Sequence, residues 1–137
     1  MSDTSIKLDI LTPMGPVRDG IEVAGVEVPG VAGELGVLPR HESLITAIVP
    51  GVVRFREGAK EVRLAVGTGF LEVKEAGRVI ILCDRAVGAD EVDRAQVTKR
   101  LGEVKAAIDL QKGAVDEGDY KALVAERAWL EAQLRIL

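Results

Sequence analysis

Side chains that could carry catalysis or bind a metal are few in this chain of 137 residues. His41 is the only histidine, and Cys83 is the only cysteine. A zinc site of the usual four-ligand kind needs more nitrogen and sulfur ligands, and neither HxxxH nor CxxC spacing occurs. Cys83 ends the apolar run 79–83, which favours a small core residue over a nucleophile. We therefore expect no catalytic residue, no metal and no disulfide within the chain.

The glycine-rich stretch 28–39, VPGVAGELGVLP, invites comparison with a phosphate-binding loop. Its glycines fall at every third residue instead of following GxGxxG or GxxxxGK[ST], and Pro39 stands where a helix N-terminus would be needed. We expect instead a tight loop at the rim of a β domain, with Glu34 and Leu35 near its tip as contacts for another protein. A glutamate that is merely solvated fits the same pattern.

Residues 5–83 show the period-two alternation of short β-strands, with Gly, Pro and charged turns between them. A strand is expected over 6–10, a second one over 21–28 with a bend at Ala24-Gly25, and hairpins over 52–66 and 70–82. Strands at this spacing are typical of a sandwich or barrel.

Helix-forming residues at spacings of three and four replace this alternation near residue 88. A first helix is expected after Asp90, which can cap it, and it should end at Lys112-Gly113. Its apolar stripe consists of Val97, Leu101, Val104 and Ile108.

A second helix is expected from about Asp119 to the terminus, antiparallel to the first. Its apolar stripe consists of Tyr120, Leu123, Leu130, Leu134 and Leu137. These stripes are narrow, so the helical hairpin should be held weakly. The hairpin is either permanently packed on the β domain or detachable, and the pattern leaves both alternatives open.

Composition argues against several functional classes. Eighteen basic and 22 acidic residues give a net charge of −4, and the basic residues form no run, so nucleic-acid binding is not expected. The N-terminus lacks a signal-peptide pattern, and no segment approaches the length of a membrane span. We expect a protein of the reducing cytoplasm.

The segment 28–51 resembles the signature of the epsilon subunit of F-type ATP synthases, the bacterial and chloroplast counterpart of mitochondrial delta. It reads VPGxxGELGVLPxHxxLxT and then Pro50-Gly51. Further similarity lies in GTGFLEV at 67–73, VIILCDRA at 79–86, and the segments 119–120 and 132–135.

The resemblance implies a non-catalytic subunit of the rotor's central stalk. Its fold would be a β-sandwich of about ten strands (1–88) that binds the gamma subunit and the c-subunit ring, followed by a regulatory hairpin of two antiparallel helices (89–137). Glu34 and Leu35 would face the c ring, whereas His41 and Thr46 would face gamma. Association with the membrane would be indirect and peripheral, on the cytoplasmic face of the bacterial inner membrane.

In this family the hairpin either folds against the β domain or extends along gamma to the alpha/beta catalytic hexamer, where it restrains ATP hydrolysis. Basic residues on the outer helix faces would then meet acidic segments of the catalytic subunits, and a solvated helix face is the simpler alternative for each. They are Lys99, Arg100, Lys105, Lys121, Arg127 and Arg135. Some relatives carry a tail beyond the segment that ends at Leu137, so inhibition that depends on such a tail should be weak.

Some relatives also bind ATP on the folded hairpin through the pattern Ile or Leu, Asp, two variable residues, then Arg-Ala. Val92 and Asp93 match its opening, but Gln96-Val97 replace Arg-Ala. This departure argues against ATP binding, and no cofactor is expected; if ATP did bind, its contacts would include Val92, Asp93 and Arg127.

Two other classes remain open. The chain could be a stand-alone β-domain interaction module that self-associates through its helical hairpin. An enzyme is the third class, and the short inventory of reactive groups argues against it.

Overall fold

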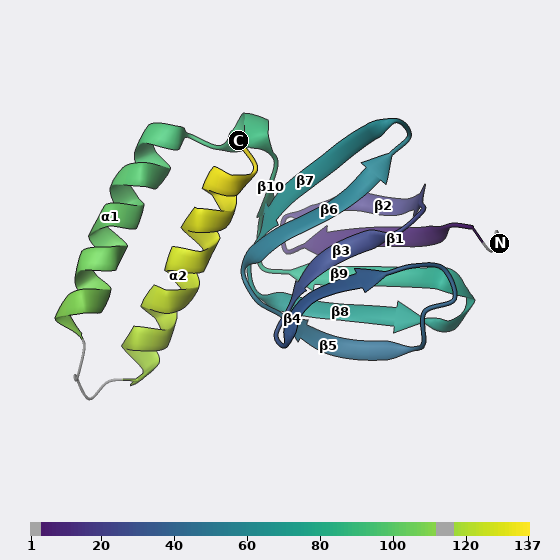
Figure 1. Ribbon diagram of the computed structural model, residues 1–137, viewed down its shortest axis with the longest axis horizontal. Coiled ribbons are helices and arrows are strands. Elements are labelled where there is room, and N and C mark those ends of the chain that lie inside the picture. Colours follow the sequence, from purple (N-terminus) through teal and green to yellow (C-terminus); the bar gives the residue numbers. More distant parts are fainter. Residues whose placement is uncertain (1–3, 112–116) are drawn as a thin grey trace.

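Ten β-strands are followed by two long α-helices in the computed structural model, which describes residues 4–111 and 117–137 (Figure 1). The strands are β1 (Ile6–Thr12), β2 (Gly15–Val23), β3 (Val26–Gly30), β4 (Gly33–Val37), β5 (Leu44–Ile48), β6 (Gly51–Glu57), β7 (Lys60–Val66), β8 (Gly69–Lys74), β9 (Arg78–Cys83) and β10 (Ala86–Val87). The helices are α1 (Arg94–Leu110) and α2 (Glu117–Arg135), with 3-10 turns η1 (Glu75–Gly77) and η2 (Ala89–Glu91). The predicted fold class is confirmed.

The strands form a sheet that curls into a nearly closed sandwich. Their order is β10-β7-β6-β3-β5-β8-β9-β1-β2, and β4 is attached to β3. Among the described strands every pairing is antiparallel except that of β1 with β9. Arg18 of β2 forms a 2.9 Å ion pair with Glu57 of β6 and lies 5.7 Å from the ring centroid of Phe55. These contacts join the end strand β2 to the opposite layer.

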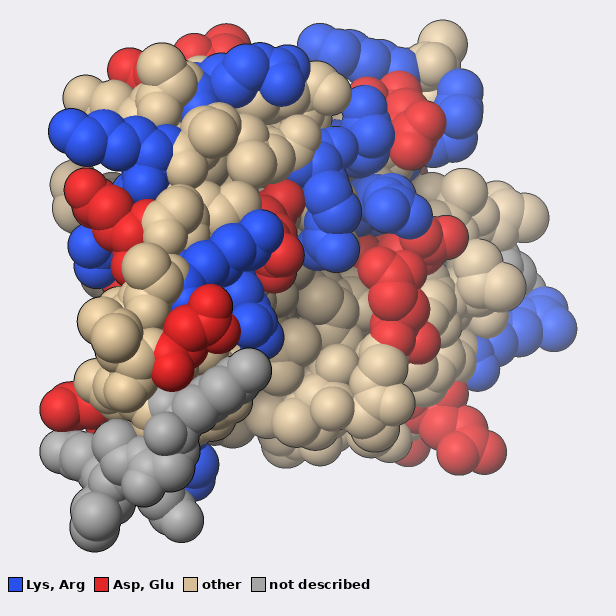
Figure 2. All heavy atoms as spheres, turned by 60° about the vertical axis from the view of Figure 1, so that its left-hand side comes forward, with Lys and Arg blue, Asp and Glu red and all other residues tan. Residues whose placement is uncertain are grey.

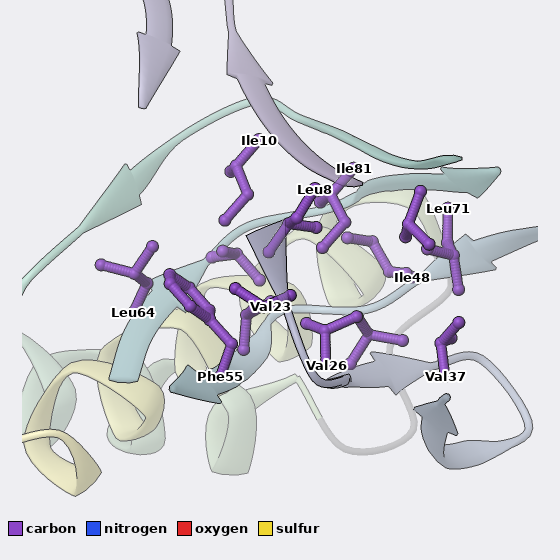
Figure 3. Close-up of a cluster of buried hydrophobic side chains, with 14 of the residues drawn as sticks. Leu8, Ile10, Val23, Val26, Val37, Ile48, Phe55, Leu64, Leu71 and Ile81 are labelled. Atoms are coloured by element: carbon purple, nitrogen blue, oxygen red, sulfur yellow. The ribbon is translucent and has the colours of Figure 1, made fainter. Parts of the chain in front are cut away.

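The core of the sandwich comes from alternating residues whose side chains point between the two layers (Figure 3). Its largest fully buried members are Ile6, Leu8, Ile10, Ile48, Leu71 and Ile81. All the buried members of this cluster lie within residues 6–83, so the sandwich has a hydrophobic core without help from the helices.

The hairpins predicted over 52–66 and 70–82 are confirmed as β6–β7 and β8–β9. The single bent strand predicted over 21–28 is wrong. β2 pairs with β1, whereas β3 pairs with β4, β5 and β6, so the chain crosses between layers at Ala24-Gly25. A Cβ at Gly25 would lie 2.9 Å from the Leu38 side chain and 3.1 Å from the Val37 carbonyl oxygen, which explains the glycine at this crossing.

The first helix is capped by Asp93, so the predicted cap Asp90 is wrong. The Asp93 carboxylate accepts a hydrogen bond of 3.1 Å from the backbone N–H of Gln96. Asp90 lies instead in η2, which the Glu91 carboxylate closes by accepting from the N–H of Gly88 at 3.0 Å. The predicted stripe of α1 is buried as expected, but the predicted stop at Lys112-Gly113 lies outside the described residues.

Helix α2 lies between α1 and the sandwich (Figure 1), and this placement changes the predicted packing. Tyr120 and Leu137 are exposed, so their assignment to the apolar stripe is wrong. A second face of α2, formed by Trp129, Ala132 and Ile136, is buried as well. The predicted narrow seam is therefore wrong, because α2 packs on two sides. The helix also begins at Glu117, two residues before the predicted Asp119.

Candidate protein-interaction surfaces

The glycine-rich stretch forms a β-hairpin, so the predicted loop is wrong. β3 and β4 pair from Val26 to Val37, which leaves only Val31 and Ala32 outside the register. Glu34 lies opposite Pro29 in β4 and is exposed. Leu35 is half-buried and packs against the sandwich core, because successive side chains of a strand point to opposite faces. Only Glu34 of this pair is fully available to a partner.

Two of these glycines are required by the geometry of the hairpin. Gly33 has a φ of +126°, a conformation that other residues rarely adopt. A Cβ at Gly30 would lie 2.8 Å from the Gly33 carbonyl oxygen. The glycine spacing that resembled a phosphate loop therefore serves a tight strand connection.

His41 and Thr46 bond locally to the backbone. His41 lies between β4 and β5, half-buried, with Nδ1 2.8 Å from the carbonyl oxygen of Glu42. Thr46 lies in β5 opposite Leu71, and its hydroxyl is 3.5 Å from the carbonyl oxygen of Ala47. Thr46 shares the face of β5 that carries the buried neighbour Leu71, whereas Ile45 and Ala47 face the other way, towards a larger surface.

That surface is a row of exposed and half-buried apolar side chains across four strands, here called the apolar row. The register aligns Ala47 of β5 with Phe70 of β8, Phe70 with Leu82 of β9, and Leu82 with Leu11 of β1. Phe70 is 58% exposed and Leu82 is 49% exposed. Ile45, two residues before Ala47 and thus on the same face of β5, is 72% exposed. Contiguous apolar patches on a surface are typical of protein interfaces.

Sequence reasoning missed the apolar row although a signal for it was present. Leu71 and Val73 are buried in the core, so the alternation of β8 must turn Phe70 outward. Leu82 is outward in β9 for the same reason, since Ile81 and Cys83 are buried. Apolar residues on both faces of two neighbouring strands are typical of strands that are buried on both sides.

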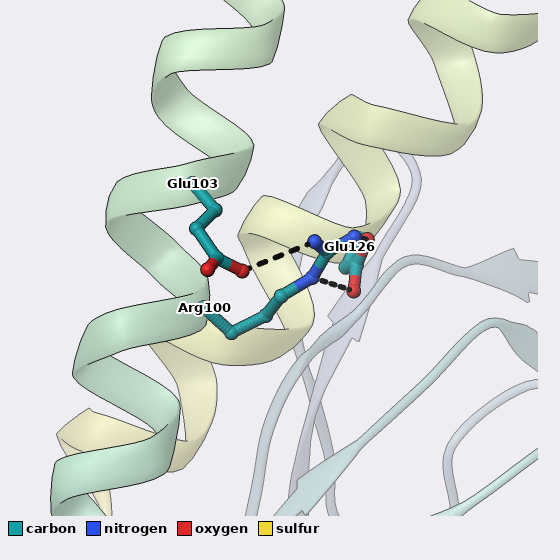
Figure 4. A network of polar contacts seen from close by, with 3 residues as sticks. All are labelled: Arg100, Glu103 and Glu126. Atoms are coloured by element: carbon teal, nitrogen blue, oxygen red, sulfur yellow. Dashed lines mark hydrogen bonds and ion pairs between the residues drawn. The ribbon is translucent and has the colours of Figure 1, made fainter.

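Among the basic residues of the helices, Arg100 is engaged within the hairpin (Figure 4). It donates from Nε and Nη2 to Glu126 at 3.0 and 2.8 Å and from Nη1 to Glu103 at 3.4 Å. The hydrogen bonds from Arg100 lower the pKa of Glu126, although partial burial opposes them. Arg100 is exposed, as predicted, but its ion pairs also tie α1 to α2.

The other predicted basic contacts are spread over the helices. Lys99, Lys105, Lys121 and Arg135 are exposed. Figure 2 shows that basic and acidic side chains lie side by side over the hairpin and do not form a single patch. Such a mixed surface gives no concentrated field for an anionic partner.

The three residues named for ATP are not gathered at one cavity. Arg127 is half-buried and lines a cleft between the helices of about 370 Å³ whose other lining residues are Lys105, Ile108, Asp109 and Glu131. Val92 packs against the helix cluster, and Asp93 caps α1. Neither Val92 nor Asp93 lines that cleft.

Within residues 4–111 and 117–137, no group of three or more His, Cys, Asp or Glu side chains is placed to hold a metal ion. The same residues include no helix that is both long and apolar enough to cross a membrane.

Comparison with known families decides what kind of protein carries these surfaces. The family model described as the ATP synthase delta/epsilon chain β-sandwich domain matches residues 5–89. The chain belongs to this ATP synthase family.

Curated relatives of this ATP synthase subunit agree over much of the chain. The ATP synthase epsilon chain of Desulforamulus reducens is 42% identical over 99 residues, which cover 71% of this chain and 74% of the relative. The epsilon chain of Alkalihalophilus pseudofirmus is 40% identical over 120 residues, or 86% of each chain. The similarity to epsilon chains therefore extends beyond the sandwich into the helices.

Solved ATP synthases contain the same fold. A chain of the Euglena gracilis mitochondrial ATP synthase, from a structure of OSCP, F1 and the c ring, is similar with a TM-score of 0.81 and 26% identity, covering 96% of this chain and 80% of that one. A chain from the central stalk and c ring of the Tetrahymena thermophila enzyme has a TM-score of 0.57 at 15% identity, covering 95% and 94%, and shows the shared fold. This epsilon-family chain is thus one subunit of a larger complex.

Proposed function

We propose that the chain is a non-catalytic central-stalk subunit of an F-type ATP synthase. In this role it couples the gamma subunit to the c-subunit ring and regulates ATP hydrolysis through residues 89–137. The apolar row is the observation that carries the proposal, because exposed Phe70, Leu82 and Ile45 need a partner that covers them.

Gamma is the partner proposed for the apolar row. The predicted gamma contact Thr46 lies in β5 between Ile45 and Ala47, and His41 precedes the same strand. A stable attachment to a rotating shaft needs a large apolar contact, which hydrogen bonds from one threonine and one histidine would not supply. We therefore assign the apolar row to the centre of the gamma interface and His41 to its border. Thr46 contributes indirectly, because its side chain lies on the opposite face of β5 from Ile45 and Ala47.

The c ring is the proposed partner of the β3–β4 hairpin. Glu34 is an exposed carboxylate two residues beyond the Val31-Ala32 turn, on a two-stranded support. It suits a polar contact with loops of the c subunits. Leu35 contributes indirectly, since its half-buried side chain packs on the core behind Glu34.

The helical hairpin is the proposed regulatory part, and its extended form would reach the alpha/beta hexamer. Lys99, Lys105, Lys121 and Arg135 remain available to acidic partners, while Arg100 is not, because Glu126 and Glu103 hold it. Nucleotide binding is not expected, since the carboxylate of Asp93 already caps α1. Attachment through gamma and the c ring would place the subunit peripherally on the cytoplasmic face of a bacterial inner membrane.

Introducing a charge into the apolar row tests this function. In co-purification with gamma, we expect Phe70→Glu to weaken binding by at least about tenfold, because a charge would be buried at the interface. Leu110→Glu is the matched control, since Leu110 is 86% exposed at the end of α1 and should leave gamma binding unchanged. Both variants should keep the thermal unfolding midpoint of the parent chain.

Two results would contradict the proposal. One is full gamma binding by the Phe70→Glu variant. The other is a parent chain that ignores gamma and forms stable homo-oligomers, which is the behaviour expected of a self-associating module.

A further inference from the structure

Arg85 makes a contact that joins the sandwich to the helices. It stands between β9 and β10, and its guanidinium carbon lies 4.4 Å from the ring centroid of Trp129 in α2. Trp129 is only 6% exposed, whereas Arg85 reaches solvent. A guanidinium over an indole face at this distance is a cation–π contact, and indole is the strongest of the aromatic partners.

The backbone that presents Arg85 is held in place. The carbonyl oxygen of Arg85 accepts a 2.9 Å hydrogen bond from the N–H of Gly67, and the N–H of Asp84 donates to the carbonyl oxygen of Thr68 at 3.0 Å. A Cβ at Gly67 would collide with the Asp84 carboxylate, so the turn between β7 and β8 fits closely against this segment. Arg85 is therefore a fixed point of the sandwich and not part of a loose linker.

The rest of the contact between α2 and the sandwich consists of apolar residues and one hydrogen bond. The second buried cluster contains Val52 of β6 and Ala65 of β7 together with Ala132 and Ile136 of α2, and Nη1 of Arg63 in β7 donates to the carbonyl oxygen of Arg135 at 3.5 Å. Trp129 is the largest side chain in this cluster, and Arg85 is the charged group of the sandwich that covers its ring. The contact between Arg85 and Trp129 thus involves the largest buried side chain of the docked helix.

The tie within the hairpin is separate from this contact. Glu126, one helical turn before Trp129, is held by Arg100 of α1 at 2.8 Å. The positive charge of Arg85 also contributes to the lowered pKa of Glu126, which indicates that these groups lie near one another. Loss of the Arg85 contact would nevertheless leave α1 and α2 joined by Arg100 and by their apolar faces.

We propose that Arg85 is the latch that keeps the helical hairpin docked on the sandwich. Releasing its guanidinium from Trp129 lets α2 leave β6 and β7 while the two helices stay paired with each other. The latch is a property of this chain by itself, so its test needs no partner subunit and is independent of gamma binding.

The test follows α2 in the isolated full-length chain. Trp129 is the only tryptophan, so its emission and its quenching by acrylamide report on its surroundings directly. Ala132 is fully buried, and a cysteine introduced there, with Cys83 replaced by alanine, reacts with a thiol reagent only when α2 undocks. Arg85→Ala should raise the labelling rate of the introduced cysteine by about five- to tenfold and shift the Trp129 emission to the red.

Matched variants separate the latch from general effects of removing charge. Arg54→Ala removes an exposed arginine of β6 whose ion pair with Glu27 is 3.5 Å long, and it should label at the parent rate. Arg85→Lys keeps the charge but loses the planar stack, and its rate should lie between those of the parent and Arg85→Ala. If Arg85→Ala does not fold, as judged by its thermal unfolding, the comparison of Arg85→Lys with Arg54→Ala carries the test.

Unchanged labelling in the Arg85 variants would overturn the proposal. So would a shift of Trp129 emission without faster labelling at position 132, because that pattern reports a local change around the indole with α2 still docked. Equal acceleration by Arg54→Ala would also overturn it, since the effect would then follow net charge alone.

Discussion

Asp9 is one of two polar residues buried in the described part of the chain, and its partners explain its place in an apolar strand. One carboxylate oxygen accepts from Nε and Nη2 of Arg78 at 3.0 and 2.7 Å. The other accepts from the N–H of Gly20 at 2.6 Å. Asp9 therefore connects β1 to β2 and β9 through side-chain hydrogen bonds as well as through the ladder.

Asp9→Ala should lower the free energy of unfolding by about 2 to 4 kcal/mol, because it leaves a buried N–H and a guanidinium without their acceptor. Urea denaturation measures the change. Glu27→Ala is the control, since its exposed ion pair with Arg54 is worth at most about 0.5 kcal/mol. Similar losses for the two variants would refute this account of Asp9.

The thiol of Cys83 supplies a pH-dependent contribution to stability. Burial, and to a lesser degree the charge of Asp84, raises the pKa of Cys83 from 9.0 to about 11. The folded protein therefore keeps this proton at pH values where the unfolded chain loses it, and the contribution to stability is full below pH 9 and disappears as pH rises towards 11.

We expect the parent chain to lose about 2 to 3 kcal/mol of unfolding free energy relative to Cys83→Ala between pH 8.5 and 11. Denaturation of both proteins at several pH values isolates this difference from the titration of lysines and tyrosine. A constant difference between parent and variant over that range would show that the thiol does not titrate as described.

Among the helices and strands, those whose residue pattern lies within one short segment could be predicted from the sequence. The β6–β7 and β8–β9 hairpins were predictable because alternation and the turn residues lie within one short segment. The break between β2 and β3 was not, since alternation continues through Ala24-Gly25 while the chain changes layer. The second face of α2 depends on the outer surface of β6 and β7, which no periodicity within the helix reveals.

The proposed interaction residues could likewise be predicted only where a local sequence pattern marks them. Glu34 could be singled out because it lies in a recognisable motif, but its strand position depends on pairing with β3. The apolar row needs the register of four strands, so it became visible only in the structure. The ion pair of Arg100 could not be predicted, because its acceptor Glu126 lies 26 residues away.

Helix α2 offers a direct comparison of two aromatic residues. Trp129→Ala should lower the unfolding free energy by about 3 kcal/mol, because a buried indole leaves a cavity, whereas Tyr120→Ala should cost less than about 0.5 kcal/mol at an exposed position. Thermal or urea unfolding monitored by circular dichroism gives both values. Equal losses of unfolding free energy for the two variants would favour the predicted single apolar stripe, which contains Tyr120, over burial of a second face of α2.

At the scale of the whole molecule, the division of the buried residues suggests which part can stand alone. The sandwich core draws on residues 6–83, while the second cluster combines α1 and α2 with Val52 and Ala65. Residues 1–88 should therefore fold without the helices, and residues 89–137 should not retain their docked arrangement without the sandwich.

Deletion of residues 89–137 should leave gamma binding intact and change ATP hydrolysis by the reconstituted complex. The truncated chain should also lose about 1 to 3 kcal/mol of stability, because Val52 and Ala65 lose their cover. Co-purification, hydrolysis assays and denaturation measure the three effects. Loss of gamma binding on this deletion would place part of the interface on the helices, contrary to the assignment to the apolar row.

The parallel pairing of β1 with β9 has a consequence for how the chain is made. Lys7 lies beside Arg78 and Leu11 beside Leu82. The first strand can therefore pair with β9 only after about 70 more residues have left the ribosome. At about 5–20 residues per second that wait lasts several seconds. The newly made strand, which carries buried Ile6, Leu8 and Ile10, is held during this time by β2 alone. Closure of the sandwich is thus a late event in biosynthesis, and it comes just before the helices that will cover β6 and β7 emerge.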